Sequence, residues 1–263
     1  TLIQQRAYQN TPILFEAPDE RFDDTETAVY GASRISSFGD LSPLYCGTID
    51  LSAASNLVEV IVGAGGNYVN SNLKSFAVGA NNLLKKVDIR NCPSLTDALD
   101  LSLCPSIEEV YAQGSSISAV KLPKSGFIRQ LHLPASLTNL TITNQKYIER
   151  FSLEGYDSLT TLHIEDVSNV PVEDIMLNAS QLNRIRLTDV YWEAESEEAF
   201  ASTIEKFENA IGMDVSENNI GKPAVVTGRV KINSISDELY NRCYESFPNL
   251  IIDDGSGTPY IIN

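Results

Sequence analysis

The hydrophobic positions of this chain follow one short pattern, in which two apolar residues flank a single residue of any type. The pattern occurs thirteen times between Thr48 and Thr188, and all twenty-six flanking positions are apolar. The pairs are Ile49/Leu51, Val60/Val62, Phe76/Val78, Val87/Ile89, Leu99/Leu101, Val110/Ala112, Val120/Leu122, Leu131/Leu133, Leu140/Ile142, Phe151/Leu153, Leu162/Ile164, Ile175/Leu177 and Ile185/Leu187. Because side chains alternate along a strand, each pair is expected to point inward and the residue between them outward. Short strands repeated in this way predict a solenoid.

The spacing of the pairs indicates the kind of solenoid. Neighbouring pairs lie about ten residues apart, so alternate pairs define two series, one beginning at Val60 and the other at Ile49. The second series advances about 23 residues per coil, which is within the range of leucine-rich repeats. The predicted fold is therefore an α/β solenoid dominated by β-structure, a right-handed leucine-rich-repeat-like tube of about 20–27 residues per coil. Two short parallel sheets form its opposite faces: face A carries the Val60 series and face B the Ile49 series.

The ninth position of the repeat supports this interpretation. Leucine-rich repeats carry Asn or Cys there, because the side chain turns inward and bonds backbone groups at the corner. This chain has Cys92 and Cys104 at that position, each followed by Pro-Ser, and serine in later coils. We expect both cysteines to be buried thiols and Cys243 to lie on a helix. Four cysteines in 263 residues do not indicate a disulfide scaffold, and no cluster of Cys and His has the spacing of a zinc site.

The two ends of the chain lack the repeat and are expected to form separate segments. Residues 1–34 are interpreted as an extended acidic arm. Residues 35–190 are the predicted solenoid, with an irregular first coil around Ile35 and Phe38. Residues 191–263 are the predicted small α/β cap, which an open solenoid end requires.

Within the cap, helical spacing predicts one helix through Phe200–Ile211 and a second through Leu239–Phe247, which Pro248 ends. Strands are predicted at Val226–Ile232, Leu250–Ile252 and Tyr260–Ile262. The strand-like end of the sequence also suggests a piece of a longer protein.

Charge narrows the range of partners. The formal net charge is −16, and the excess of acidic residues is concentrated in residues 1–30 and 191–220. A nucleic-acid-binding protein would need a basic stripe, which is absent from the sequence. No apolar run is long enough for a transmembrane helix, so we expect no membrane insertion.

The outward positions do not form a catalytic or metal-binding constellation. The two histidines, His132 and His163, fall on faces A and B respectively, which argues against a shared metal or proton relay. Asp50 and Asp100 lie two coils apart on face B, roughly 9.6 Å at one strand spacing per coil, close to the separation in inverting glycosidases. Ala77 between them offers no wall for a substrate. We therefore predict a protein without catalytic residues, metal or cofactor.

Face A carries the larger and less polar outward residues. A column of aromatic, apolar and basic groups on a rigid sheet is suited to binding another protein. The alternative is that these side chains only stabilise the sheet through cross-strand pairs. The candidate partner-binding residues are Ile61, Lys86, Arg90, Tyr111, His132, Arg150 and Met176.

Several blocks of the sequence resemble a known group of proteins. The blocks are Asp23–Gly31, Gly39–Gly47, Val87–Leu95, Ile107–Ala112, Phe151–Tyr156 and Arg184–Thr188 followed by Trp192. They are similar to leucine-rich-repeat proteins encoded among the tail and minor structural genes of bacteriophages and prophages of Gram-positive bacteria. The resemblance implies a non-enzymatic virion protein that acts in assembly or host adsorption within a multi-subunit particle. Its expected partners are other virion proteins and a host surface receptor.

Two other functions remain open from the sequence. A bacterial cell-surface adhesin with leucine-rich repeats would show a signal peptide and a wall anchor in the full-length gene. A carbohydrate-processing β-solenoid would show carboxylates clustered on adjacent coils. In the virion interpretation, we expect the acidic arm and the cap to hold the protein in the particle, which leaves face A for a partner.

Overall fold

The computed structural model describes residues 26–28, 36–39, 41, 45, 47–124, 126–168, 170–212 and 224–255. The chain divides into two compact units. Unit 1 comprises Thr1–Leu137 and Glu149–Gly155, and unit 2 comprises Thr138–Ile148 and Tyr156–Asn263. Cys46, Ile35, most of the predicted arm and the strand predicted at Tyr260–Ile262 lie outside the described residues.

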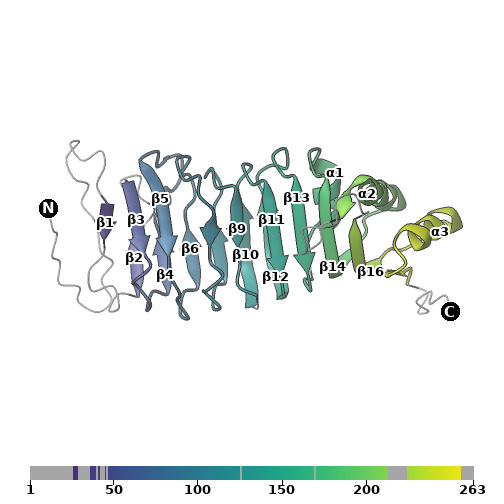
Figure 1. The fold of residues 1–263 in the computed structure, drawn as a ribbon, viewed down its shortest axis with the longest axis horizontal. Coiled ribbons are helices and arrows are strands. Elements are labelled where there is room, and N and C mark those ends of the chain that lie inside the picture. The colour runs from purple at the N-terminus through teal and green to yellow at the C-terminus, as the bar shows by residue number, and fades with distance from the viewer. Residues whose placement is uncertain are drawn as a thin grey trace. The chain divides into compact units, whose positions relative to one another are not determined.

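Unit 1 is built mainly from parallel strands that belong to three sheets (Figure 1). The largest sheet has the strand order β12-β10-β8-β6-β4-β2, and its strands are β2 (Ser37–Gly39), β4 (Glu59–Ile61), β6 (Lys86–Asp88), β8 (Glu109–Tyr111), β10 (Gly126–Leu133) and β12 (Gln145–Leu153). The second sheet has the order β1-β3-β5, with β1 at Glu26–Ala28, β3 at Gly47–Leu51 and β5 at Leu73–Val78. In the third, β7 (Leu99–Asp100) pairs in parallel with β9 (Ala119–Lys121). Between β3 and β10, every second strand of the chain belongs to the six-stranded sheet and the strands between them belong to the other two sheets. This alternation is what the two interleaved series predict.

The register of the six-stranded sheet aligns the predicted inward residues. Val60 is opposite Val87, Val87 is opposite Val110, and Val110 is opposite Leu131. All four side chains have no exposed surface. Across the whole chain, all but three of the twenty-six predicted inward residues are buried; Val78 and Phe151 are half-buried and Leu177 is exposed. Burial of these apolar side chains is the main source of stability, at about 1.5–3 kcal/mol for each Val, Leu or Ile.

The start of the repeat region is also ordered around an apolar residue. Phe38, predicted to centre an irregular first coil, lies on β2 with 1% of its surface exposed. Within the predicted arm, Glu26–Ala28 form β1, which pairs in parallel with β3.

Unit 2 contains a parallel sheet with the strand order β17-β16-β14-β13-β11 and three helices. Its strands are β11 (Asn139–Thr143), β13 (Thr161–Glu165), β14 (Arg184–Glu193), β15 (Ile211–Gly212), β16 (Val225–Lys231) and β17 (Leu250–Asp253). The short β15 pairs with β14 beside the start of β16. The strands predicted at Val226–Ile232 and Leu250–Ile252 are thereby confirmed.

Both predicted helices of the cap are present, although the first ends at Asn209 and Ile211, predicted to belong to it, lies on β15. The first is α2 (Glu197–Asn209), where Phe200, Ile204 and Phe207 are fully buried. The second is α3 (Asp237–Ser246), which buries Leu239 and Cys243. A serine caps the N-terminus of each helix, Ser196 for α2 and Ser236 for α3.

One predicted strand is wrong. The residues of the predicted pair Ile175/Leu177 lie on a helix, α1 (Val172–Asn178), and Leu177 is 52% exposed. Val172, Ile175, Met176 and Ala179 are buried at helical spacing, and two acids occupy the first turn, where the helix dipole favours them. Met176 is only 3% exposed, so its place among the exposed face A residues is corrected.

The described residues thus form mostly parallel sheets with three helices, an α/β fold dominated by strands. Strand β14 runs through residue 190, where the predicted boundary between solenoid and cap falls. The predicted segments 1–34, 35–190 and 191–263 remain predictions. No helix in the described ranges is long and apolar enough to cross a membrane.

Candidate partner-binding surface

The outward residues of the six-stranded sheet in unit 1 form a continuous row. The register places Ile61 opposite Asp88, Asp88 opposite Tyr111, and Tyr111 opposite His132. Ser152 on β12 extends the row, because its Oγ lies 2.6 Å from Nδ1 of His132. The predicted column of face A therefore exists as a physical row of neighbouring side chains.

Tyr111 is held between two flat groups. On one side, the guanidinium carbon of Arg90 lies 4.6 Å from the centroid of the tyrosine ring. On the other side, the His132 ring stacks at a centroid distance of 5.2 Å, with an angle of 11° between the planes. A guanidinium over an aromatic ring is attracted by the ring's negative face. Arg90, which follows β6, Tyr111 on β8 and His132 on β10 are thus packed against one another.

Asp88 fixes the position of the Arg90 guanidinium in this stack. Its side chain is 1% exposed, although the alternation of the strand predicts an outward residue. The carboxylate accepts two hydrogen bonds from Arg90, from Nε at 2.9 Å and from Nη2 at 2.6 Å. This bidentate pairing raises the pKa of Arg90 and sets the plane of its guanidinium. Gly63 leaves space for this carboxylate, since a Cβ there would lie 3.0 Å from Oδ1 of Asp88 and 2.6 Å from the backbone nitrogen of Arg90.

Two hydrogen bonds hold the His132 ring in one orientation. Its Nε2 lies 2.9 Å from Oε1 of Gln130, and its Nδ1 contacts the Ser152 hydroxyl. Because an amide oxygen only accepts, Nε2 donates to Gln130, and the Ser152 hydroxyl can donate to a neutral Nδ1. Burial, followed by the charges of Arg90 and Arg150, lowers the pKa of His132, which favours the same neutral form.

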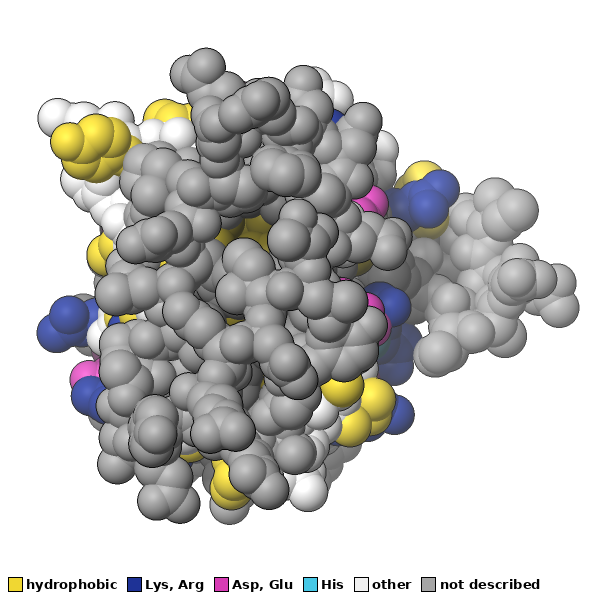
Figure 2. Space-filling model, turned by 90° about the vertical axis from the view of Figure 1, so that its left-hand side faces the viewer, with side chains coloured by type: hydrophobic (Ala, Val, Ile, Leu, Met, Phe, Trp, Pro, Cys, Tyr) yellow, Lys and Arg dark blue, Asp and Glu magenta, His cyan; other side chains and the backbone are white. Residues whose placement is uncertain are grey.

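The charges around the row are largely paired across strands. Lys86 Nζ lies 2.9 Å from Glu59 Oε1, and Arg129 lies between Glu109 at 3.7 Å and Glu149 at 3.8 Å. Figure 2, viewed from the left-hand side of Figure 1, likewise shows Lys and Arg side chains next to Asp and Glu side chains at both sides of the view. Partly exposed pairs of this kind contribute about 0–1 kcal/mol each, so they set the local charge more than the stability.

Of the seven candidate residues, the structure places six on this surface of unit 1. Ile61, Lys86, Arg90, Tyr111 and His132 are half-buried, and Arg150 is exposed. Met176 is buried on α1 in unit 2 and does not belong to the set.

The corners of the repeats use the predicted cysteines together with asparagines that the sequence analysis missed. The thiol of Cys92 donates to the Val62 and Arg90 carbonyl oxygens, and that of Cys104 donates to the Gly79 carbonyl. Burial raises the pKa of Cys92 to about 12, as expected for an unreactive structural thiol. Both cysteines are buried and free, as predicted, and so is Cys243 on α3.

Asn81 occupies the corner position one coil before Cys104. Its Nδ2 donates to the carbonyls of Ala54 (3.1 Å) and Leu57 (2.9 Å), and its Oδ1 accepts from the backbone of Leu83 and Leu84. Asn70, one coil before Cys92, is also fully buried. The sequence could have revealed these asparagines, because each stands one coil before a corner cysteine: 22 residues separate Asn70 from Cys92, and 23 separate Asn81 from Cys104.

The carboxylates on face B do not have the properties of a catalytic pair. Asp50 accepts bonds from the backbone N–H and hydroxyl of Ser52, and Asp100 accepts the same pair of bonds from Ser102. These hydrogen bonds lower the pKa of both aspartates. An inverting glycosidase needs one carboxylic acid with a raised pKa.

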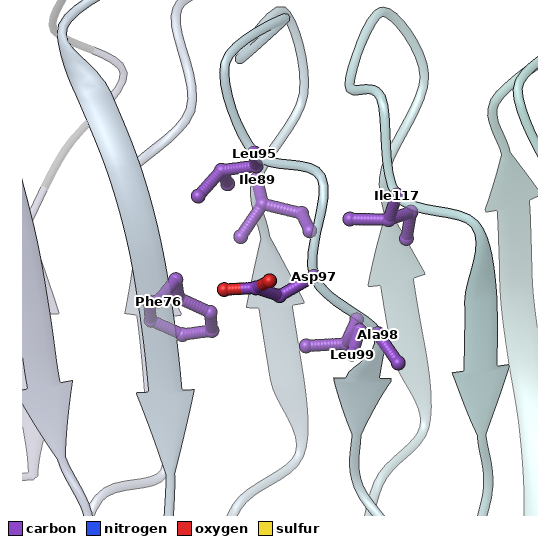
Figure 3. A pocket seen from close by; sticks show the side chains of 7 residues that line it. All are labelled: Phe76, Ile89, Leu95, Asp97, Ala98, Leu99 and Ile117. Atoms are coloured by element: carbon purple, nitrogen blue, oxygen red, sulfur yellow. The ribbon is translucent and has the colours of Figure 1, made fainter.

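No group of three or more metal-ligating side chains occurs among the residues with described positions. A small pocket in unit 1, of about 10 Å³, is lined mainly by Phe76, Ile89, Leu95, Leu99 and Ile117. Figure 3 shows the Asp97 carboxylate projecting toward Phe76 across this space. The volume is about that of one water molecule, far below that of a small-molecule site. We assign it to imperfect packing.

Comparison with known proteins gave no further assignment: no family model, no curated protein and no solved structure matches this chain.

Proposed function

We propose that this chain is a non-enzymatic structural protein of a bacteriophage or prophage particle, located in the tail or another appendage. It acts in assembly or host adsorption through contacts with other proteins of the particle and with a host receptor. The fold that carries this role is a right-handed, leucine-rich-repeat-like solenoid.

The observation that carries the proposal is the row Arg90–Tyr111–His132 on the outer surface of the six-stranded sheet. Its side chains are fixed before any partner arrives, by stacking at 5.2 Å and by the buried Asp88 carboxylate. A preorganised surface loses little side-chain entropy on binding, and Tyr and Arg are the residue types enriched where binding energy concentrates. The assignment to a phage particle is supported by the resemblance of the sequence blocks described above.

The solenoid interpretation is supported by two features of unit 1. Successive strands alternate between sheets, and their inward residues align coil after coil. The corner side chains bond to backbone groups of the preceding coil, as Asn81 does with Ala54 and Leu57. Stacked repeats that bury a common core are expected to behave in this way.

Labelling of purified particles tests the location. An antibody to this chain should decorate one defined appendage in negative-stain images, and particles from a strain that lacks the gene should remain unlabelled. Labelling of the bacterial cell wall, with none on particles, would contradict the proposal and favour the surface adhesin.

The non-enzymatic assignment has its own test. Asp50→Asn and Asp100→Asn should change nothing but local charge, because each carboxylate bonds only within its own strand or to Lys121. Release of reducing ends from cell-wall or capsular polysaccharide, measured for the wild type and both variants, should stay at the blank. Hydrolysis that the two substitutions abolish would show that the chain is an enzyme.

A further inference from the structure

The parallel ladder on face B is interrupted within unit 1. Strands β1, β3 and β5 form one sheet, β7 and β9 belong to another, and no ladder joins β5 to β7 in the described part of the chain. On face A the strands of the same coils are continuous, because β4 pairs with β6 and β6 pairs with β8. All these strands lie in unit 1. One sheet is therefore split where the opposite sheet is whole.

The split leaves β5 without a backbone bond that the following coil makes. On face B, the N–H of the inward residue Leu101 donates at 2.8 Å to the carbonyl of Lys121, the residue just before an inward residue of the next coil. By the same rule, the inward residue Phe76 would donate to Ala98. No such bond occurs between these two described residues. The main-chain ladder is therefore open at the centre of β5.

The burial of inward side chains is also lower along this line. Phe76 is 9% exposed and Val78 is half-buried, whereas Leu99 and Leu101 in the next coil are 3% and 0% exposed. The small pocket of Figure 3 lies between Phe76 and Leu99, and the Asp97 carboxylate projects across it. Apolar contact across the split is thus weaker than in the neighbouring coil.

The split is closed at both of its ends. Before the strands, the Ser94 hydroxyl donates to the Ser71 carbonyl at 2.7 Å. After the strands, the Asn81 N–H donates to the Leu103 carbonyl at 3.1 Å. The two coils are therefore joined at their corners. A small separation of β5 from β7 breaks no bond between Phe76 and Ala98, and the corner bonds limit how far it goes.

We infer that unit 1 opens locally and reversibly along the line between β5 and β7, while the ladder of face A stays closed. In the open state the backbone of β5 and the Phe76 side chain reach solvent. Native proteins open first where buried apolar contacts and backbone bonds are fewest. The opening lets face B deform while the row Arg90–Tyr111–His132 on face A keeps its shape. It holds whether or not the protein belongs to a phage particle.

Amide hydrogen exchange of the isotopically labelled full chain, followed by NMR, tests the opening. The Phe76 amide should exchange at least about 100-fold faster than the amides of Leu101 and Ile89. Both reference amides are bonded at 2.8 Å, Leu101 on face B and Ile89 to Tyr111 on face A. Low urea concentrations should leave the Phe76 rate unchanged, because a local opening exposes little new surface.

A disulfide across the split separates opening from a fixed gap. Ala77→Cys with Asp100→Cys replaces one exposed residue on each side, and oxidation holds the two Cα atoms within about 7 Å. The oxidised variant should slow Phe76 exchange at least about tenfold, and reduction should restore it. The matched control, Asp50→Cys with Ala77→Cys, joins the paired strands β3 and β5. Its oxidation should change the Phe76 rate less than about twofold.

Three results would overturn the inference. Equal protection of Phe76 and Leu101 would show that β5 and β7 are paired in solution. A Phe76 rate that the disulfide between positions 77 and 100 leaves unchanged would show a fixed gap that does not open. Exchange of Ile89 with the same opening free energy as Phe76 would show that both faces open together.

Discussion

The outward side chains of faces A and B stand on similar parallel strands but are held in different ways. On face A, Tyr111 and His132 contact each other across neighbouring strands, and Asp88 is buried beneath Arg90. On face B, Asp50 and Asp100 bond mainly to serines two residues further along the chain, just past the ends of their strands. Bonds between strands fix a surface as a whole, whereas local bonds fix each residue separately. Face A is therefore the surface on which a partner would find a fixed shape.

The largest effect on stability should come from placing a charge at an inward position, since both faces bury their inward residues. Leu133→Asp places a carboxylate at a site with no exposed surface, where an unpaired charge costs more than the whole stability of a typical domain. We expect no folded protein, as judged by circular dichroism and soluble yield. Thr141→Asp, at an exposed outward position of β11, is the control and should fold with an unchanged melting temperature. A cooperative melt of Leu133→Asp would refute the inward assignment.

A smaller loss of stability should distinguish Asp88, the buried carboxylate of face A, from Asp100, an exposed carboxylate of face B. Asp88→Ala leaves the Arg90 guanidinium without its bidentate partner, and should lower the free energy of unfolding by about 2–4 kcal/mol. Asp100→Ala, which removes an exposed carboxylate with half its side chain in water, should cost less than about 1 kcal/mol. Urea unfolding at pH 7 measures both values. Equal costs for the two variants would mean that the faces do not differ in this way.

The stack between Tyr111 and His132 should appear as a coupling energy. A double-mutant cycle with alanine at both positions should give about 0.5–1.5 kcal/mol of interaction, because stacked rings contribute beyond their buried area. The matched cycle of Tyr111 with Asp100 joins residues of different sheets and should give less than about 0.5 kcal/mol. A coupling within error of zero for the first cycle would show that the stack adds nothing to stability.

The smallest effect concerns pH. The folded protein holds the pKa of His132 below its ordinary value of 6.5, so the folded state favours the neutral imidazole. Its contribution is present above pH 6.5 and is lost as the pH falls through the lower folded pKa. Unfolding free energies of the wild type should therefore decrease between pH 7 and pH 5 by more than those of His132→Gln. His163 titrates in both proteins, so the difference isolates His132. A smaller decrease in the wild type would reverse the sign of the shift.

The sequence predicted most strands because two inward residues per strand leave a strong periodic signal. It failed at Ile175/Leu177 because Ile175 belongs to a helical set with Val172 and Met176, three and four positions apart, while Leu177 is an exposed apolar residue that only resembles the second member of a strand pair. A single pair cannot distinguish the two structures. The helices α2 and α3 have longer apolar stripes and were predicted correctly.

The candidate surface was predictable as a row of residues but not as a structure. Alternation places Tyr111 and His132 side by side, yet it also predicts an exposed Asp88. The burial of that carboxylate depends on Arg90, two residues further on, and on the missing side chain of Gly63 in the preceding coil. Neither the contact with Arg90 nor the approach of Gly63 from the preceding coil leaves a periodic signal in the sequence. The corner asparagines Asn70 and Asn81 were not predicted because polar residues leave no mark in the apolar pattern, and only the cysteines at the corner position stand out by type.

The four hydrogen bonds of Asn81 also constrain how the gene can change in length. Its amide joins carbonyl groups 24 and 27 residues back along the chain to N–H groups within its own coil. Recombination that gains or loses one entire repeat would leave these donors and acceptors in phase. Coils of this chain already differ in length, with 27 residues from Val60 to Val87 and 20 from Leu131 to Phe151, so loops between strands accept small insertions. An insertion between Ala54 and Leu57, or between Asn81 and Leu84, would instead separate the amide from part of its four partners. Inherited length variants should therefore gain or lose whole repeats or loop residues, and insertions at these two corner segments should be rare.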